Sequence, residues 1–376
     1  MKYRFDEIAI NSTAKKKPGD ADRAHYIGLE HIDSECLTIT RWGSDVTPAG
    51  EKLVMKKGDV LFGKRRAYQR KVGIAPFDGI FSAHGLVLRP NTKIVDSEFF
   101  PFFISSDQFM ERAVRISVGG LSPTINWKDL KEQEFNLPPI AEQKVLAEKL
   151  WAAYRLKESY KKLLTATQEM VKSQFIEMFG NPLSQVQRYP LEKLGDCCVL
   201  NPRRPSISLS DTDMVSFVPM PCVSENGYLQ DVADEEYGKV KKGFTYFENK
   251  DVLFAKITPC MENGKGAIAQ ELTNGIGMGS TEFHVLRPIE GKSNSYWLLA
   301  LTRMPIFREQ ASKNMSGTGG QKRVGASFLD NFMVGLPPVE EQNRFERIYR
   351  QADKSGFELR KSIEAIDKVI KSLINS

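Results

Sequence analysis

The chain contains one series of short motifs twice in the same order, and this repetition limits the folds that it can adopt. The four motif pairs are KGDVLFGK (57–64) with NKDVLFAK (249–256), GLVLRP (85–90) with FHVLRP (283–288), SVGG (117–120) with GTGG (317–320), and LPPIAEQ (137–143) with LPPVEEQ (336–342). The separation grows slowly, from 192 residues between Asp59 and Asp251 to 199 between Leu137 and Leu336. Four collinear pairs indicate a duplicated unit with few insertions, since chance recurrence would not keep both order and spacing.

Each copy begins with a mixed α/β part and continues into one long helix. Short β-type runs such as DVLFGK are bounded by Gly, Pro, Asn and Asp, which is typical of strands between turns. One helical stretch is expected in each copy, at 99–115 and at 296–312. The predicted fold is α+β, with two tandem mixed α/β domains and an internal pseudo-twofold repeat. The predicted division is a domain at 1–137, a helix at 138–180, a domain at 181–336 and a helix at 337–376.

The two long helices are predicted to pair with each other. Each follows a Pro-Pro pair and begins with Glu and Gln, which suits the first turn of a helix. Their apolar residues follow the three-four spacing of a coiled-coil seam. The candidates for helix–helix packing are Leu146, Leu150, Leu156 and Leu163 in the first helix, and Phe345, Ile348, Leu359, Ile363, Ile366 and Ile370 in the second. An antiparallel coiled coil would form a rod of roughly 50–60 Å and relate the copies by a pseudo-twofold axis.

The sequence contains no recognisable catalytic or metal site. It has no GxxxxGK[ST] phosphate loop and no GxGxxG after a strand, so neither a common nucleotide-driven motor nor a built-in S-adenosylmethionine site is expected. The five cysteines show no CxxC spacing, and the adjacent Cys197 and Cys198 are interpreted as packing residues. A reducing cytoplasm is therefore expected. No apolar run approaches the roughly 20 residues of a membrane span, and the opening residues lack the apolar stretch of a signal peptide.

Basic residues gather in the globular parts of a chain whose net charge is +6. The candidate DNA-binding residues are Lys15, Lys16, Lys17, Lys64, Arg65, Arg66, Tyr68, Gln69, Arg70, Lys71, Arg203, Arg204, Lys256, Lys265, Thr318, Gln321, Lys322 and Arg323. Lys and Arg neutralise phosphates, and Arg and Gln can bond to base edges. For any single cluster, a solvated charged face remains an equal alternative. The segment 64–71 is basic, whereas its counterpart KITPCMENGKG at 256–266 is far less so, as two unlike half-sites would require.

The whole chain resembles the specificity subunits of type I restriction-modification systems (HsdS). The resemblance lies in a glycine-rich loop, a short helix and L-P-P-x-x-E-Q, found at 317–342 and, with SVGGLSPTINW in place of SGTGGQKRVGASF, at 117–143. The MFGNP at 178–182 also resembles the junction of that family into its second domain.

The resemblance implies a non-catalytic, cytoplasmic subunit that selects a DNA site for other chains. Each target-recognition domain would recognise one half of a bipartite site in double-stranded DNA, and the helices would set the gap. Two methyltransferase subunits would bind around the helices, and restriction/translocase subunits would join them. The cofactor S-adenosylmethionine would be held by the methyltransferase subunit, with none in this chain. Two alternatives stay open: a specificity subunit of another restriction or defence class, and a two-domain scaffold with a helical stalk that binds no DNA.

Overall fold

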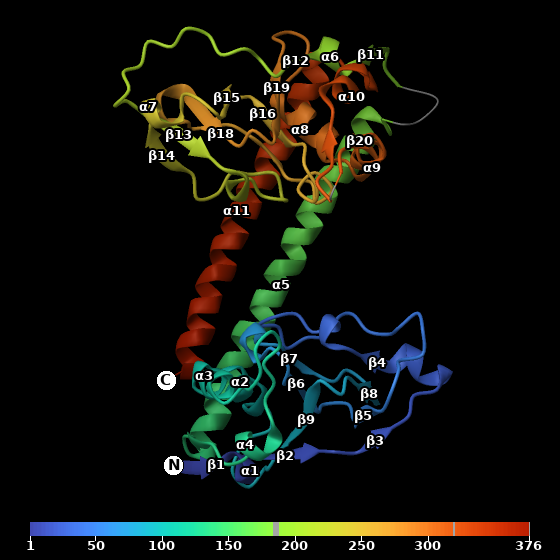
Figure 1. Ribbon diagram of the computed structural model, residues 1–376, viewed down its shortest axis with the longest axis vertical. Coiled ribbons are helices and arrows are strands. Elements are labelled where there is room, and N and C mark those ends of the chain that lie inside the picture. The colour runs from blue at the N-terminus through green and yellow to red at the C-terminus, as the bar shows by residue number, and fades with distance from the viewer. Residues whose placement is uncertain (183–187, 319, 376) are drawn as a thin grey trace. The chain divides into compact units, whose positions relative to one another are not determined.

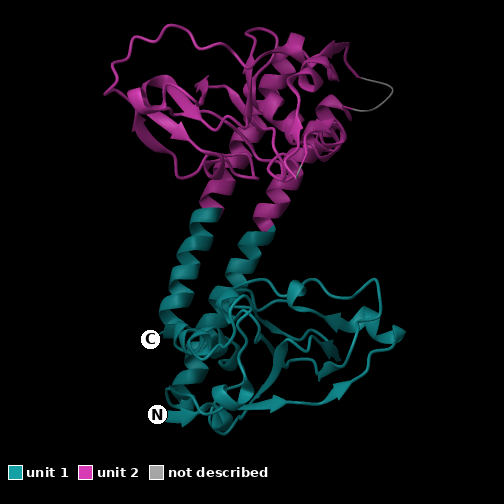
Figure 2. Cartoon of the chain, in the orientation of Figure 1, with its two compact units in different colours: residues 1–162, 360–376 teal, residues 163–359 magenta. Residues whose placement is uncertain are grey.

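The computed structural model describes residues 1–182, 188–318 and 320–375 (Figure 1). The chain divides into two compact units, which Figure 2 colours separately. Unit 1 comprises Met1–Lys162 and Arg360–Ser376, and unit 2 comprises Leu163–Leu359. Gly319 of the second glycine-rich loop, residues 183–187 of the predicted second domain and residue 376 of the predicted second helix lie outside the described residues.

Unit 1 contains two four-stranded sheets. The first has the order β2 (Ala9–Ser12), β9 (Gly85–Pro90), β6 (Val60–Gly63), β7 (Val72–Ile74), and the second has the order β3 (Lys15–Lys16), β5 (Lys52–Met55), β8 (Gly79–Phe81), β4 (Tyr26–Ile27). Only the pair β4–β8 is parallel among the described strands of these sheets. A further pair joins β1 (Lys2–Arg4) to β10 (Glu134–Asn136). All four residues of β6 are buried, which explains why the motif DVLFGK is apolar without alternation.

Unit 2 repeats this plan. Its sheets have the orders β12 (Cys198–Leu200), β19 (Phe283–Pro288), β16 (Val252–Ala255), β17 (Gly266–Ile268), and β14 (Ala233–Glu236), β13 (Met214–Val218), β18 (Ile276–Gly279), β15 (Thr245–Glu248). Two short pairs join β11 (Leu191–Lys193) to β22 (Met333–Gly335), and β20 (Met315–Ser316) to β21 (Arg323–Val324). The outer strand of the second sheet differs, since β3 extends β5 in unit 1 whereas β14 extends β13 in unit 2. The predicted tandem mixed α/β architecture is confirmed.

Short helices complete each unit. They are α1 (Phe5–Ile8), α2 (Phe100–Ser105), α3 (Asp107–Arg115) and α4 (Trp127–Leu130) in unit 1, and α6 (Leu194–Cys197), α7 (Tyr237–Val240), α8 (Ser295–Arg303), α9 (Pro305–Lys313) and α10 (Ala326–Asn331) in unit 2. The prediction of one helical stretch per copy is wrong, because each stretch is broken into two helices. Ser106 breaks the first by leaving the helical region and capping α3, where its side chain accepts from the Phe109 N–H. Met304 breaks the second, since a residue that precedes proline avoids the helical region.

Two long helices, α5 (Ile140–Phe179) and α11 (Val339–Asn375), each contribute to both units. Unit 1 contains the start of α5 and the end of α11, which are joined by an ion pair between Lys157 and Asp367. Unit 2 contains the end of α5 and the start of α11, where Phe345 packs against Phe175 and Phe179 with ring centroids 5.5 and 5.4 Å apart. In each unit the start of one helix therefore lies against the end of the other.

The predicted seam of the first helix needs correction. Leu146 is half-buried and Leu150 is buried, but Leu156 and Leu163 are 45% and 52% exposed, so their assignment to the seam is wrong. The buried line along the start of α5 is Gln143, Ala147, Leu150, Tyr154 and Lys157. Its spacing is that of a coiled coil, but Gln143 and Lys157 are polar, so the apolar pattern did not reveal it. In α11, Phe345 is buried, and Ile348, Leu359, Ile363, Ile366 and Ile370 are half-buried.

Candidate nucleic-acid interface

One ion pair fixes the same pair of strands in both units. Arg89 on β9 binds Asp59, before β6, through Nε–Oδ1 and Nη2–Oδ2 contacts of 2.7 and 2.9 Å. Arg287 on β19 binds Asp251, before β16, with 2.8 and 2.7 Å for the same atoms. The neighbouring carboxylate raises the pKa of each arginine, and both aspartates are buried. The strand pairs β6–β9 and β16–β19 are therefore held in the same way in the two units. We call each of these strand pairs the frame of its unit.

Three loops lie side by side on this frame in unit 1, at 33–38, 64–71 and 117–124. Ser34 Oγ donates to the Gln69 carbonyl at 2.6 Å, which joins the first two loops. The Arg66 N–H donates to the Pro123 carbonyl at 2.7 Å, and the Ile125 N–H donates to the Lys64 carbonyl at 2.9 Å. These bonds bring together the basic segment and the glycine-rich segment that the sequence singled out separately.

The exposed candidates of unit 1 lie on and beside these loops. Arg65, Arg66 and Tyr68 are exposed, and both arginines donate to Ser122 Oγ, at 3.3 and 3.2 Å. Lys64 is half-buried, and burial together with the charge of Lys15 lowers its pKa. The remaining candidates are Gln69, which is half-buried, and Lys15, Lys16 and Lys17, which are exposed. Cations thus lie on and beside the loop 64–71, and one of them, Lys16, pairs with Asp22 at 2.8 Å.

The last two candidates of the loop 64–71 are bound by carboxylates and a carbonyl of the protein. Arg70 lies between carboxylates, with Nη2 2.8 Å from Asp107 Oδ1 and Nε 3.0 Å from Glu35 Oε1. Lys71 Nζ donates to the Leu29 carbonyl at 2.6 Å. These two side chains therefore hold the loop, and the DNA contact expected of them from the sequence stays a prediction.

Unit 2 brings together the equivalent loops, at 224–229, 256–266 and the described residues of the glycine-rich loop, 317–318 and 320–323. The Val324 N–H donates to the Lys256 carbonyl at 2.9 Å, as Ile125 does to Lys64 in unit 1. Thr258 Oγ1 donates to the Gly320 carbonyl at 2.8 Å, and Asn263 Nδ2 donates to Glu225 Oε1 at 2.9 Å. The backbone arrangement is repeated, whereas the side chains on the loops differ.

The candidates of unit 2 also divide into exposed side chains and side chains that are bound within the protein. Thr318, Gln321 and Lys322 are exposed on the glycine-rich loop. Arg323 instead pairs with Glu282 through three contacts of 3.1, 2.9 and 2.8 Å, which lowers the pKa of that carboxyl. Lys256 and Lys265 are half-buried, and Lys265 donates to the Met220 carbonyl at 3.4 Å. Arg203 and Arg204 are exposed, but Arg204 donates to the Lys241 carbonyl, so it lies beside the segment that leads to β15.

Sequence reasoning missed the tyrosines that tie these loops to the long helices. The hydroxyl of Tyr154 on α5 accepts from the Thr38 N–H at 2.9 Å. In unit 2, Arg303 donates to the hydroxyl of Tyr349 on α11 at 3.3 Å and to the Glu225 carbonyl at 2.9 Å. Both tyrosines lie on the buried line of their helix, where aliphatic residues are usual, and that position is the signal that identifies them.

Three titratable groups of unit 2, His284, Cys197 and Cys198, are buried and bonded within the protein. His284 Nε2 lies 2.9 Å from the Val324 carbonyl, and burial lowers its pKa. Burial raises the pKa of Cys197 to about 11 and that of Cys198 to about 12, which suits packing residues. Among the described residues, no cluster of His, Cys, Asp and Glu could hold a metal ion. Within the same residues, no helix has the length and apolarity to cross a membrane.

Comparison with known proteins gives the family. The model of the type I restriction modification DNA specificity domain matches twice, at residues 8–166 and 193–366. Because these matches cover most of the chain, the chain belongs to this family.

Two of the relatives each match about half of the chain. The specificity subunits of the type I restriction enzymes EcoEI and EcoAI, both from Escherichia coli, are 35% and 36% identical over 189 and 178 residues. These matches cover 48% and 46% of the chain but only 31% and 30% of the relatives' own lengths. The crystal structure of the S subunit of a type I restriction-modification system from M. genitalium has the same fold, with a TM-score of 0.58 at 13% identity, covering 100% of this chain and 94% of that one.

Proposed function

We propose that this chain is the DNA-specificity subunit of a type I restriction-modification complex. Each unit would bind one half of a bipartite site in double-stranded DNA through its three loops. Membership of the family supports this role, as do the specificity subunits among its relatives.

One observation carries the proposal: the two units share a frame but differ in their loops. The ion pairs Asp59–Arg89 and Asp251–Arg287 hold equivalent strands in the same way. In the loop 64–71, unit 1 exposes Arg65 and Arg66, whereas the equivalent positions of unit 2 are the half-buried Ile257 and Thr258. On its glycine-rich loop, unit 2 exposes Gln321 and Lys322. Arg suits guanine and phosphates, and Gln suits adenine, so different loops on one frame suit two different half-sites.

The long helices would set the gap between the half-sites. With 40 and 37 residues, they would span about 60 and 55 Å at about 1.5 Å per residue. We retain the division into recognition domains at 1–137 and 181–336 and spacer helices at 138–180 and 337–376 as part of this proposal.

The chemistry would belong to partner chains. Two methyltransferase subunits would bind at the helices and hold S-adenosylmethionine, and restriction/translocase subunits would complete the complex. This chain would then be a non-catalytic subunit in the cytoplasm, where its five free cysteines would stay reduced.

Methylome sequencing of the host, followed by domain exchange, tests the function. We expect a bipartite methylated motif that disappears when the gene for this chain is deleted. Replacing residues 1–137 with the corresponding domain of another specificity subunit should change one half of the motif and leave the other half intact. A motif that persists after deletion, or that changes in both halves after exchange, would contradict the proposal.

Two alternatives give different outcomes. A specificity subunit of another restriction or defence class would also lose its motif on deletion, but its gene would lie beside a fused methyltransferase-nuclease. A two-domain scaffold with a helical stalk would bind no DNA, either alone or with a co-expressed methyltransferase.

A further inference from the structure

The side chain of Arg70 anchors the basic loop 64–71 to α3. Its Nη2 lies 2.8 Å from Asp107 Oδ1 and donates to the Ser105 carbonyl at 2.9 Å. The Arg70 and Asp107 side chains are only 29% and 28% exposed. Salt therefore screens this pair less than an ion pair on the open surface.

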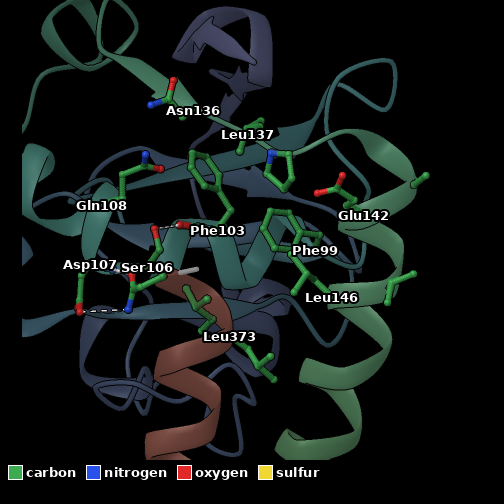
Figure 3. Close-up of a pocket in the computed structure, with 15 residues that line it drawn as sticks. Phe99, Phe103, Ser106, Asp107, Gln108, Asn136, Leu137, Glu142, Leu146 and Leu373 are labelled. Carbon is green, nitrogen blue, oxygen red and sulfur yellow. Dashed lines mark hydrogen bonds between the residues drawn. The ribbon is translucent and has the colours of Figure 1, made fainter.

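Asp107 is in turn bound by the last turns of α11. Asn375 Oδ1 accepts from the Asp107 N–H at 2.9 Å, and Asn375 Nδ2 donates to Asp107 Oδ2 at 3.1 Å. Lys371 Nζ lies 3.5 Å from the same Oδ2. Figure 3 shows Asp107 near Leu373 of α11, at the edge of a groove of 1060 Å³. One carboxylate thus links the end of α11 to the loop.

The backbone of the loop depends on such anchoring. Arg66 and Arg70 flank the short turn Ala67–Gln69, and their φ angles are 56° and 51°. L residues other than Asn and Asp rarely adopt this left-handed region, so surrounding contacts must hold the turn in it. Arg70 supplies part of these contacts through Asp107 and Glu35, while Arg65, Arg66 and Tyr68 remain exposed.

We propose that Asp107 is a positioning residue, through which the end of α11 holds the basic loop of unit 1 in its DNA-binding conformation. DNA binding by the first copy would then depend on the helix that belongs to the second copy. This inference rests on the proposed function, and it deepens that function by naming how the loop is controlled.

Unit 2 has an analogous link with different chemistry. Gln168 on α5 donates from Nε2 to Asn226 Oδ1 at 3.1 Å. The neighbouring Glu225 accepts from Asn263, which lies in the loop 256–266. With the separation of 198 residues, the counterpart of Asp107 is Pro305, which cannot form an ion pair. The effect of removing the Asp107 carboxylate should therefore be confined to the half-site bound by unit 1.

The experiment measures binding of the full chain, with its co-expressed methyltransferase, to duplex DNA carrying the mapped motif. Asp107→Asn removes the charge with little change in shape, and Asp107→Glu restores it. The double variant Lys371→Ala with Asn375→Ala removes the partners on α11 without altering the loop. The matched control is Asp78→Asn, which removes a carboxylate from an exposed ion pair with Lys56 in the same unit.

Asp107→Asn and the α11 double variant are expected to weaken binding about fivefold and to lower the salt dependence of binding. Asp107→Glu and Asp78→Asn should bind as the wild type does. Discrimination against mismatches should weaken in one half-site only. A purely structural role would lower the melting temperature and leave the salt dependence unchanged, which would overturn the proposal, as would unaltered binding by Asp107→Asn. Failure of the wild type to prefer the mapped duplex would instead contradict the proposed function.

Discussion

Gln143 in unit 1 makes the same three hydrogen bonds as Gln342 in unit 2. The Oε1 atoms accept from the backbone N–H groups of Asp96 and Asn294, at 2.8 and 2.9 Å. The Nε2 atoms donate to two carbonyls in each unit, at 3.0 and 2.8 Å for Gln143 and at 2.9 Å for both bonds of Gln342. Both side chains are fully buried. The glutamine of the repeated motif therefore joins the first turn of each long helix to its globular part.

Replacing this amide should destabilise unit 2. Gln342→Leu leaves three backbone groups without a partner in a buried place, which should lower the free energy of unfolding by about 2 kcal/mol. Urea denaturation measures the change. Gln351→Leu is the control, because Gln351 is exposed on the same helix. Equal stability of Gln342→Leu and the wild type would show that the three bonds contribute nothing.

The buried ion pair of unit 2 should be more sensitive than that of unit 1. Arg287→Met leaves the Asp251 carboxylate, which is only 1% exposed, without its ion-pair partner. This change should lower the free energy of unfolding by about 3 kcal/mol. Arg89→Met should cost less, since Arg89 is 41% exposed and water can replace it more readily. Thermal unfolding of both variants tests the order. The double variant Arg287→Met with Asp251→Asn should recover part of the loss, and equal melting temperatures for the two single variants would contradict this account.

Acid should destabilise unit 2 through His284. Burial lowers the pKa of His284 in the folded chain, so the folded state binds its proton less readily than the unfolded state. The resulting stability is complete above the unfolded value of about 6.5 and declines as the pH falls below it. Thermal melts between pH 8 and pH 5.5, a range of roughly one unit or more on each side of that value, should show a weaker pH dependence for His284→Gln than for the wild type. His84→Gln changes an exposed histidine and should keep the dependence of the wild type.

The exposed arginines of unit 1 should contact phosphates or bases. Replacing Arg65 or Arg66 with alanine should lower the slope of log affinity against log salt by about one each where a phosphate contact is lost. Fluorescence anisotropy with duplex DNA of the mapped motif measures the slope. Lys149→Ala changes an exposed lysine on α5 and serves as the control. If both arginine variants keep the slope and the base preference of the wild type, these two residues do not contact the DNA.

Shortening both long helices should change the gap and leave the half-sites intact. Deleting residues 157–163 from α5 and 354–360 from α11 removes one heptad from each helix, about 10 Å. Methylome sequencing should then report the same half-sites with a shorter gap. An unchanged gap would show that the helices do not set it.

The duplication and the long helices could be predicted because their signals are local. Pro-Pro followed by Glu and Gln marks each helix start, and Gly180 with φ of 81° follows the end of α5. The apolar pattern misplaces the seam of α5, because the seam includes the buried Lys157, which pairs with Asp367 on another helix. Likewise, nothing near Arg70 in the sequence shows that Asp107 binds it. The burial of Lys157 and the orientation of Arg70 depend on pairing with polar residues far away in the sequence. The spacing of apolar residues does not indicate such pairs.

Each long helix starts in one unit and ends in the other, so every unit is assembled from parts of both copies. A single copy would lack the second helix segment that its globular part packs against, and an identical chain could supply it. The result would be a closed dimer with twofold symmetry, which recognises a palindromic target. Fusion of the two copies into one chain keeps that mutual completion and lets each set of loops vary without the other. Under the proposed function, the single chain would no longer need a palindromic target and would recognise an asymmetric site.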